Sequence, residues 1–176
     1  MTSQNSTATN YSLYTYDQTG RVSEIYFYAK PMNDPKGKFE LRSTRSFEYE
    51  GSLIVKSYIS DPSTGQTNLI YAYTYDSRGN VINEKYYSSM ESKNKLSSET
   101  SYKYDDYKNP FQVMNPYGLP GIYTNPNNII ESKFTSYEDI PDILKYKTQL
   151  LTYEYNSAGY PVKLIQDGKT VEEYMY

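Results

Sequence analysis

The clearest pattern along the chain is a regular alternation of aromatic and polar residues. Residues 71–75 read Tyr-Ala-Tyr-Thr-Tyr, and residues 151–155 read Leu-Thr-Tyr-Glu-Tyr. The longest case runs from 39 to 49, where Phe, Leu, Phe and Tyr occupy positions 39, 41, 47 and 49 and every even position is polar. Side chains alternate between the two faces of a β-strand, so these segments predict half-buried strands.

Helical periodicity is weak throughout the chain. The best helical candidate is Tyr137–Lys147, which contains Ile140, Ile143 and Leu144. Pro141 lacks the backbone donor that a helix interior needs, which limits this segment to about two turns. The pattern of apolar residues therefore predicts an all-β fold.

A Tyr-x-Tyr-Asp-x-x-Gly motif recurs along the chain. Residues 14–22 and 73–81 match it closely, and residues 153–162 carry Asn in place of Asp and one extra residue before Val. Residues 47–53 have a shortened turn, and residues 102–110 have Asn in place of Gly. The second tyrosines of these units are Tyr16, Tyr49, Tyr75, Tyr104 and Tyr155.

Each unit has the chemistry of a β-hairpin. Asp or Asn opens a turn because its side chain accepts a hydrogen bond from the backbone two residues on. Gly follows where the turn needs a left-handed residue, and Val or Leu starts the returning strand. Serial hairpins predict an antiparallel up-and-down meander of about 10–11 strands, with equivalent tyrosines stacked across neighbouring strands.

The returning strands are apolar on both faces, as in residues 22–28 and 53–59. Such strands need cover on both sides, and an open meander leaves two exposed edges. Both considerations favour a rolled sheet or a partly closed barrel over a flat sheet.

We expect one domain. Residues 1–10 are rich in Ser, Thr and Asn and predict a disordered tail, so that the β-repeat domain covers 11–176. Residues 106–127 contain four prolines among apolar residues, which is too apolar for a linker and too rich in proline for a strand. This segment predicts a long ordered loop that plugs one barrel end or covers one sheet face.

Composition excludes several functions. The 176 residues contain no Cys, His or Trp, which rules out a histidine base, a cysteine nucleophile, a Cys/His zinc site and disulfides. The net charge of -3 does not favour nucleic-acid binding. The 24 tyrosines replace the missing aliphatic area, because a Tyr ring packs while its hydroxyl reaches water or a partner. The mean hydropathy of -0.82 argues against a membrane-spanning barrel.

The units at 14–22 and 73–81 resemble the tyrosine-aspartate (YD) repeat of RHS-type shell proteins. A second resemblance covers about 11–176: residues 102–111, the Pro/Tyr loop, Asn127-Asn128-Ile129 and residues 153–161 look like a family of Bacteroidetes lipoproteins with a porin-like β fold. The second resemblance implies an exported protein in the periplasm or at the cell surface. The lipid anchor would lie outside this Cys-free sequence.

Two kinds of acidic site were considered. Asp17, Asp76 and Asp105 with Asn156 lie at equivalent turns and are candidate cation ligands, but no Asp-x-Asp-x-Asp loop occurs and turn capping is the simpler role. The acid pairs at 105–106, 138–139 and 172–173 are candidates for glycosidase catalysis. Adjacent acids on a strand point to opposite faces, so we predict no catalytic residue, no metal site and no cofactor.

Accessible tyrosines are the remaining candidates. Stacked rings suit sugar binding, and Tyr107, Tyr117 and Tyr123 lie in or beside the Pro-rich segment. The alternative role is that tyrosine simply builds the sheet. The sequence favours a non-enzymatic, monomeric envelope module with a binding or structural role, for which a glycan or another envelope protein is the candidate partner. The alternatives are a section of a YD-repeat shell or adhesion protein and, with less support, a carboxylate-dependent enzyme acting on glycans.

Overall fold

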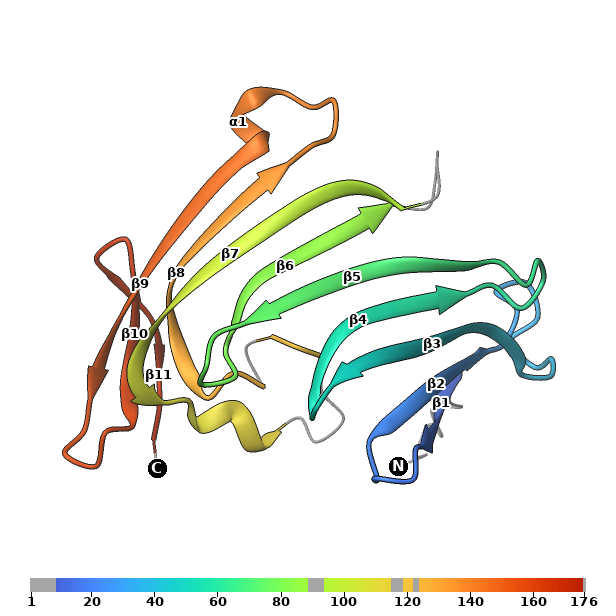
Figure 1. Ribbon diagram of the computed structural model, residues 1–176, viewed down its shortest axis with the longest axis horizontal. Coiled ribbons are helices and arrows are strands. Elements are labelled where there is room, and N and C mark those ends of the chain that lie inside the picture. The colour runs from blue at the N-terminus through green and yellow to red at the C-terminus, as the bar shows by residue number, and fades with distance from the viewer. Residues whose placement is uncertain (1–8, 89–93, 115–118, 122–123, 176) are drawn as a thin grey trace, which may run out of the picture.

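The computed structural model describes residues 9–88, 94–114, 119–121 and 124–175. They form one antiparallel sheet of eleven strands in which every strand pairs with its neighbours in sequence (Figure 1). The predicted all-β meander is therefore confirmed. The strands are β1 (Asn10–Tyr16), β2 (Val22–Ala29), β3 (Glu40–Glu50), β4 (Leu53–Ser60), β5 (Thr67–Tyr75), β6 (Val81–Ser88), β7 (Lys95–Lys108), β8 (Asn127–Ser136), β9 (Tyr146–Tyr155), β10 (Pro161–Gln166) and β11 (Lys169–Glu173).

Helical structure among the described residues is confined to two short elements. One is the 3-10 helix η1 (Pro110–Met114), and the other is α1 (Asp142–Lys145), which lies inside the predicted helical candidate. Pro141 immediately precedes α1, where its missing donor costs nothing. Neither helix is long and apolar enough to cross a membrane.

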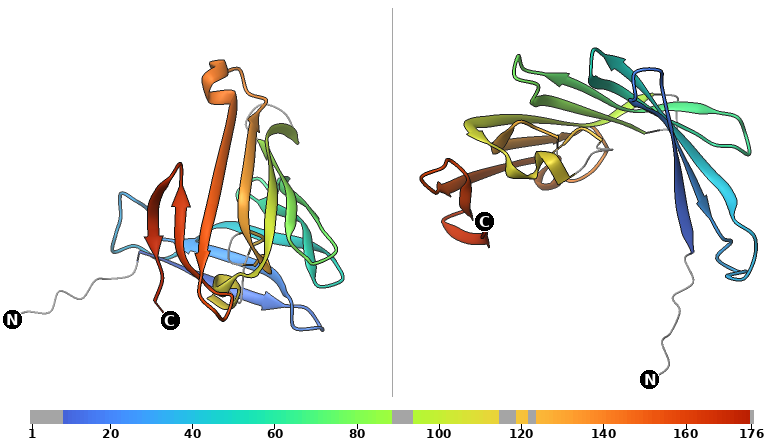
Figure 2. Two further views of the ribbon diagram at one scale, coloured as in Figure 1. Left: turned by 90° about the vertical axis from the view of Figure 1, so that its left-hand side faces the viewer. Right: turned by 90° about the horizontal axis from the view of Figure 1, so that it is seen from below.

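The sheet is strongly bent but does not close. Figure 2 shows it as an arch, and β1 and β11 remain its two edges. Every strand pair except β8–β9 contains a register shift. A bulge of this kind bends the strand and increases its twist, which explains the rolling. The expected rolled sheet is present, and it stops short of a barrel.

The three complete turns share one hydrogen-bond pattern. In the first, the backbone N–H groups of Thr19 and Arg21 donate to Oδ1 of Asp17 at 2.8 and 3.0 Å, and Gly20 takes a φ of 83°. Asp76 and Asn156 accept the same two bonds in their turns. The turn prediction is confirmed, including the equivalence of Asn and Asp.

Successive hairpins are joined by tyrosine hydroxyls. Tyr49 donates to the carbonyl of Val22 at 2.7 Å, and Tyr75 donates to the carbonyl of Ile54 at 2.5 Å. Tyr104 makes the same bond to the carbonyl of Val81. The expected stacking of equivalent tyrosines is wrong, because they lie on alternate strands, about 10 Å apart. The hydroxyl of each tyrosine reaches the backbone of the strand that lies between them, whereas the two rings are too far apart to stack.

Strand register sorts the side chains into two faces. In the register, Phe47 is opposite Ser57, Ser57 is opposite Tyr71, and Tyr71 is opposite Tyr86. We call this side the tyrosine face; on β3 to β7 it carries Arg45, Phe47, Tyr49, Ser57, Tyr71, Tyr73, Tyr75, Glu84, Tyr86, Tyr102 and Tyr104.

The opposite side of the sheet is charged. It carries ion pairs between Lys56 and Glu48 at 3.0 Å and between Lys103 and Glu131 at 3.2 Å. Of the apolar residues that the structure describes, only Tyr73, Val81 and Pro161 are buried. The molecule is thus a single layer, and aromatic rings on one face take the place of a two-layer core.

Asparagines attach the Pro-rich segment to the sheet. Oδ1 of Asn125 accepts the N–H of Val81 at 2.9 Å, and Asn80 donates to Oδ1 of Asn127 at 3.0 Å. Asn109 donates to the carbonyl of Asn125 at 2.9 Å. The described residues of this segment, 110–114, 119–121 and 124–126, accordingly lie on the inner side of the arch (Figures 1 and 2).

The predicted boundaries of the loop and the tail stay predictions, because both segments include residues outside the described part of the chain. The predicted loop, 106–127, includes the last residues of β7 and the first of β8. Of the predicted tail, 1–10, residues 1–8 lie outside the described part. Thr9 accepts a hydrogen bond from the N–H of Lys30, and Asn10 begins β1.

Candidate functional site

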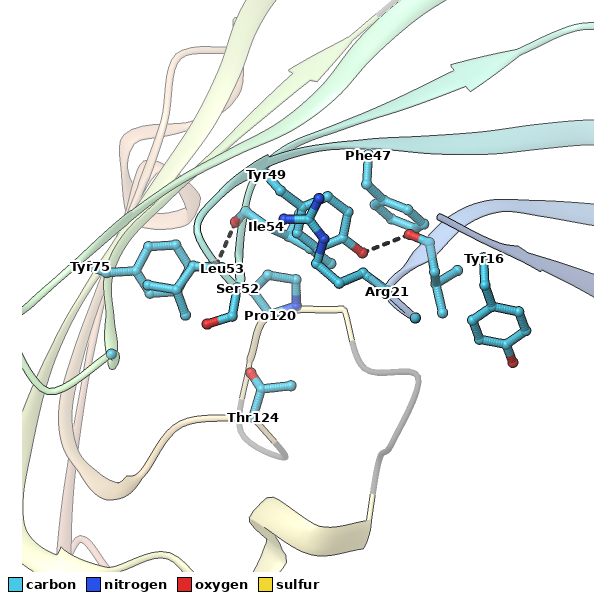
Figure 3. Close-up of a pocket in the computed structure, with 13 residues that line it drawn as sticks. Tyr16, Arg21, Phe47, Tyr49, Ser52, Leu53, Ile54, Tyr75, Pro120 and Thr124 are labelled. Carbon is cyan, nitrogen blue, oxygen red and sulfur yellow. Dashed lines mark hydrogen bonds between the residues drawn. The ribbon is translucent and has the colours of Figure 1, made fainter. Parts of the chain in front are cut away.

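One hollow lies between the turns of the first three hairpins and the Pro-rich segment. It has a volume of about 470 Å³ (Figure 3). We call it the turn cavity; it is lined by Tyr16, Gly20, Arg21, Val22, Phe47, Tyr49, Ser52, Leu53, Ile54, Tyr75, Gly79, Pro120 and Thr124. Its volume falls in the range of about 300–1,000 Å³ that is typical of small-molecule sites.

The aromatic wall of the turn cavity is held by the bonds that join the hairpins. Tyr49 and Tyr75 are fixed through their hydroxyls, and both rings face the cavity (Figure 3). Burial raises the pKa of both hydroxyls, so each stays a hydrogen-bond donor across the physiological range. Phe47 packs edge-on against Tyr49, with ring centroids 6.4 Å apart. Tyr16, at the rim, is 51% exposed.

Arg21 is the only charged residue of the cavity lining, and it is neutralised. Its guanidinium pairs with Asp17 at 2.7 Å, lies 4.5 Å from the centre of the Tyr49 ring and donates to the carbonyl of Gly51. A hydrogen bond from the Thr19 hydroxyl, helped by Arg21, holds the pKa of Asp17 well below its usual value. The guanidinium therefore acts as a wall that stiffens the first two turns.

The opposite wall comes from the Pro-rich segment. Pro120 and Thr124 face the aromatic rings across the hollow (Figure 3). Thr124 is held locally, since its hydroxyl lies 2.9 Å from the N–H of Gly121 and 3.0 Å from the carbonyl of Gly121. Asn125, the next residue, is fixed on the sheet by its bond to Val81. The described residues Pro120, Thr124 and Asn125 therefore face the sheet at its turn end, whereas the predicted ordered loop as a whole stays a prediction.

The chemistry of this lining is that of a binding site. Rings, aliphatic side chains and a proline surround a few polar groups, and none of the described residues that line the cavity is a carboxylate. A glycosidase needs two carboxyl groups across a cleft, about 5–9.5 Å apart. The turn cavity is thus suited to a neutral ligand with flat apolar faces.

Of the tyrosines singled out from the sequence, Tyr107 lies outside the lining of the turn cavity. Tyr107 is 47% exposed, and its ring stacks on Tyr155 with the centroids 3.9 Å apart. It also contacts the turn at Gly159. Tyr117 and Tyr123 lie outside the described residues, so their predicted role stays a prediction.

Sequence reasoning missed the residues that line the turn cavity. Tyr16, Tyr49 and Tyr75 are the second tyrosines of three repeat units, and Phe47 is the first aromatic of its unit. The signal that finds them is the repeat itself, because equivalent positions of serial hairpins come to the same end of a meander.

The acidic candidates are used in other ways. The turn carboxylates of Asp17 and Asp76 accept backbone hydrogen bonds, and no cluster of three metal-ligating acids occurs among the described residues. Asp105 accepts bonds from Tyr155 and Asn128, whereas Asp106 points outward to Arg78 at 2.7 Å. These two acids therefore do not form a facing pair.

Glu138 and Glu172, which belong to the other two acid pairs, lie away from the turn cavity. Glu138 lies 3.8 Å from Lys95, at the far end of β7 from the turn cavity. Glu172, on the edge strand β11, accepts a hydrogen bond from Tyr174 at 2.7 Å. Neither acid lines the turn cavity.

Comparisons with known proteins add little. No protein-family model matches the chain, and no curated protein matches it. Among solved structures, the chain is similar to a porin-like protein from Bacteroides uniformis, with 13% sequence identity, 93% of this chain and 86% of that chain covered, and a TM-score of 0.29. A likeness at this level carries no argument about function.

Proposed function

We propose that the protein is a non-enzymatic binding module that takes a neutral glycan into the turn cavity. The observation that supports this most is the lining: aromatic rings from three hairpins, a proline wall and one arginine whose charge is already neutralised. Aromatic faces pack against the C–H faces of sugar rings, and nearby hydroxyls and carbonyls meet sugar hydroxyls.

The walls of the turn cavity are already fixed in the free protein, so a ligand can bind without a large rearrangement of the protein. Tyr49 and Tyr75 are fixed by hydrogen bonds, and Asn125 anchors the facing segment. A ligand then loses little binding energy to the ordering of protein groups. The envelope location, periplasmic or at the cell surface, and the lipid anchor belong to the same proposal. They rest on the resemblance of residues 102–111, the Pro/Tyr loop, residues 127–129 and residues 153–161 to Bacteroidetes lipoproteins.

The proposal is tested by screening the purified protein on a glycan array and measuring each hit by calorimetry. Two variants, Tyr16→Ala and Phe47→Ala, remove rings from the cavity, and we expect each to weaken binding at least tenfold. Tyr146→Ala is the matched control, because Tyr146 is 67% exposed and does not line the cavity. The proposal is contradicted if no glycan on the array binds, or if Tyr146→Ala weakens binding as much as the two cavity variants do.

A second candidate function is a section of a YD-repeat shell. The observation in its favour is that the sheet is open at β1 and β11, so that further strands have edges on which to pair. Light scattering across a concentration series tests it. Growth into larger assemblies that is blocked by Leu13→Lys on β1 supports a shell, and a strict monomer contradicts it.

A further inference from the structure

Beyond the turn cavity, the tyrosine face carries a carboxylate with no partner of its own. Glu84 lies on β6, opposite Tyr73 of β5 on one side and Thr100 of β7 on the other. It is half-buried, and it has neither an ion pair nor a hydrogen bond to any residue in the described part of the chain. A charge in such a place is costly unless something compensates it.

Other strand carboxylates are treated differently. Glu48, Glu131 and Glu154 are each paired with a lysine on the charged face or at the sheet end. The tyrosine face also carries Arg45 on β3, which has no ion pair within the described residues. Lys95 of β7 lines the hollow beside Tyr86 and is paired with Glu138 at 3.8 Å. Arg45 lies on β3, and two strands separate it from β6.

The surroundings of Glu84 are aromatic. Tyr71 stacks on Tyr73 with centroids 5.9 Å apart and packs against Tyr86 at 5.3 Å. Tyr102 follows on β7, one pair along the same face from Thr100. Faces of electron-rich rings around a carboxylate attract an organic cation, because the ring quadrupole and the carboxylate act in the same direction.

The electrostatic environment of Glu84 favours a bound cation on the side that faces β7. The charge of Glu84 contributes to the raised pKa values of Tyr71, Tyr73, Tyr102 and Tyr104, for all of which burial is the main cause. Arg45 lowers the pKa values of Tyr71 and Tyr73, and it has no such effect on the two β7 tyrosines. A cation between β6 and β7 thus gains from Glu84 and avoids Arg45.

The face is also hollowed beside this position. A cavity of about 400 Å³ is lined by Tyr86, Ser98 and Phe134 among others. Tyr86 belongs to both the ring cluster and this hollow. Glu84 itself does not line this hollow, and its other wall carries the Lys95–Glu138 ion pair. The hollow reaches the ring cluster through Tyr86 and leaves room there for the alkyl groups of a substituted ammonium ion.

We propose that the tyrosine face binds a small organic cation of the substituted-ammonium class, with Glu84 as the counter-ion and Tyr86 and Tyr102 as ring walls. The site is separate from the turn cavity and shares no lining residue with it. It therefore stands whether or not the turn cavity takes a glycan. The ring walls supply the apolar contact, and the carboxylate supplies the selection for charge.

The probe is choline, and its control is 3,3-dimethylbutan-1-ol, which has the same shape without the charge. Each is titrated into isotopically labelled protein while amide and tyrosine-ring NMR signals are followed. We expect saturable shifts of β6 and β7 signals with choline, and at least tenfold weaker binding of the neutral isostere. Equal responses to the two probes, or no response to choline, overturn the proposal.

Variants separate this site from general charge effects. Glu84→Gln keeps the size of the side chain, and we expect it to weaken choline binding at least tenfold. Glu50→Gln removes the same charge from an exposed position at the end of β3, and we expect unchanged binding. Tyr86→Ala, at a 37% exposed ring, gives an independent check with an expected loss of at least threefold. Full binding by Glu84→Gln refutes the assignment.

Discussion

Glu84 carries its charge on a face that is built mainly from rings and hydroxyls. Burial raises the pKa of its carboxyl above the ordinary 4.5. Tyr73, directly across the strand pair, is the most buried ring of the sheet, with 5% exposed. A strand pattern shows that Glu84 shares a face with tyrosines, but its missing partner is a property of three-dimensional spacing and could not be predicted from the sequence.

The raised pKa predicts how stability depends on pH. A carboxyl whose folded pKa lies above its unfolded pKa contributes stability below the unfolded value and loses it as pH rises through the folded value. Glu84→Gln is therefore expected to stabilise the protein at pH 7 by about 1 kcal/mol, or about 2–4 °C in Tm. Thermal melts between pH 3.5 and 8 check this. The gain should shrink toward zero below pH 4.5, and a constant gain contradicts the assignment.

Asp76 could be assigned from the sequence, because its role is local. Its Oδ1 accepts the N–H groups of Arg78 and Asn80, and its Oδ2 accepts the amide of Asn80. Burial alone would raise the pKa of Asp76, but these bonds from Asn80 and Arg78 bring it below the usual value. Each of these contacts lies within four residues, which is why the motif reveals them.

We expect Asp76→Ala to destabilise the fold by about 1–3 kcal/mol, since it leaves backbone donors without acceptors. Asp76→Asn keeps the Oδ1 acceptor, as Asn156 does in its own turn, and should cost less than half as much. Urea denaturation of the three proteins gives the comparison. Equal losses in both variants would show that charge, rather than turn geometry, is what matters.

At the scale of the element, the unit of construction is the hairpin with its tyrosine hydroxyl. Hairpins could be predicted because alternation and turn residues are close in sequence. The link between hairpins could not, since the acceptor is a backbone carbonyl 21 residues away from Tyr75 and carries no sequence signature. The Tyr-x-Tyr pairs are thus explained by two roles, a ring on the tyrosine face and a bond to the preceding unit.

Removal of a single hydroxyl tests the second role. Tyr75→Phe keeps the ring and loses the bond to the carbonyl of Ile54, so we expect a loss of about 1 kcal/mol. Tyr11→Phe is the matched control, because the contacts of Tyr11 with Tyr28 and Phe39 are made by its ring. Chemical denaturation measures both. A neutral Tyr75→Phe would mean that the ring alone joins the units.

The Pro-rich segment could be identified from its composition, but its place could not. Its docking depends on buried asparagines that recognise backbone far away, as when Asn125 accepts the N–H of Val81. The positions of these asparagines follow no periodic pattern in the sequence, so such a contact cannot be predicted from it. The same reasoning explains why the turn cavity was missed: one wall is supplied by this segment.

Asn125→Ala tests the docking. Asn125 is 1% exposed, and its loss leaves the buried N–H of Val81 unsatisfied, which we expect to cost about 2–3 kcal/mol. Asn10→Ala, at an exposed position of β1, is the control. Hydrogen exchange of the Val81 amide reports the change directly. An unchanged exchange rate in Asn125→Ala contradicts the assignment.

At the scale of the whole molecule, the fold is one bent layer with two open edges. The meander and its rolling could be predicted, because repeats and doubly apolar strands are visible in the sequence. The extent of rolling depends on bulges spread over almost every strand pair, and no local pattern gives their sum. The sheet consequently stops as an arch where a partly closed barrel was also expected.

A single layer buries little apolar area, and this predicts a small heat-capacity change on unfolding. A compact domain of this length is expected to give about 2.1–2.6 kcal/mol/K. We expect a clearly smaller value, since the heat capacity rises with the apolar surface that unfolding exposes. Differential scanning calorimetry over several pH values measures it. A value inside the compact range contradicts the single-layer description.

The neighbour-only pairing of the strands also bears on how quickly the chain finds its structure. Contacts between adjacent hairpins need only short loops to close, which lowers the contact order and speeds folding. The exception is the β7–β8 pair, whose strands are joined by residues 109–126. Closing that longest connection carries the largest entropic cost, so it marks the step at which the two halves of the arch become one cooperative unit.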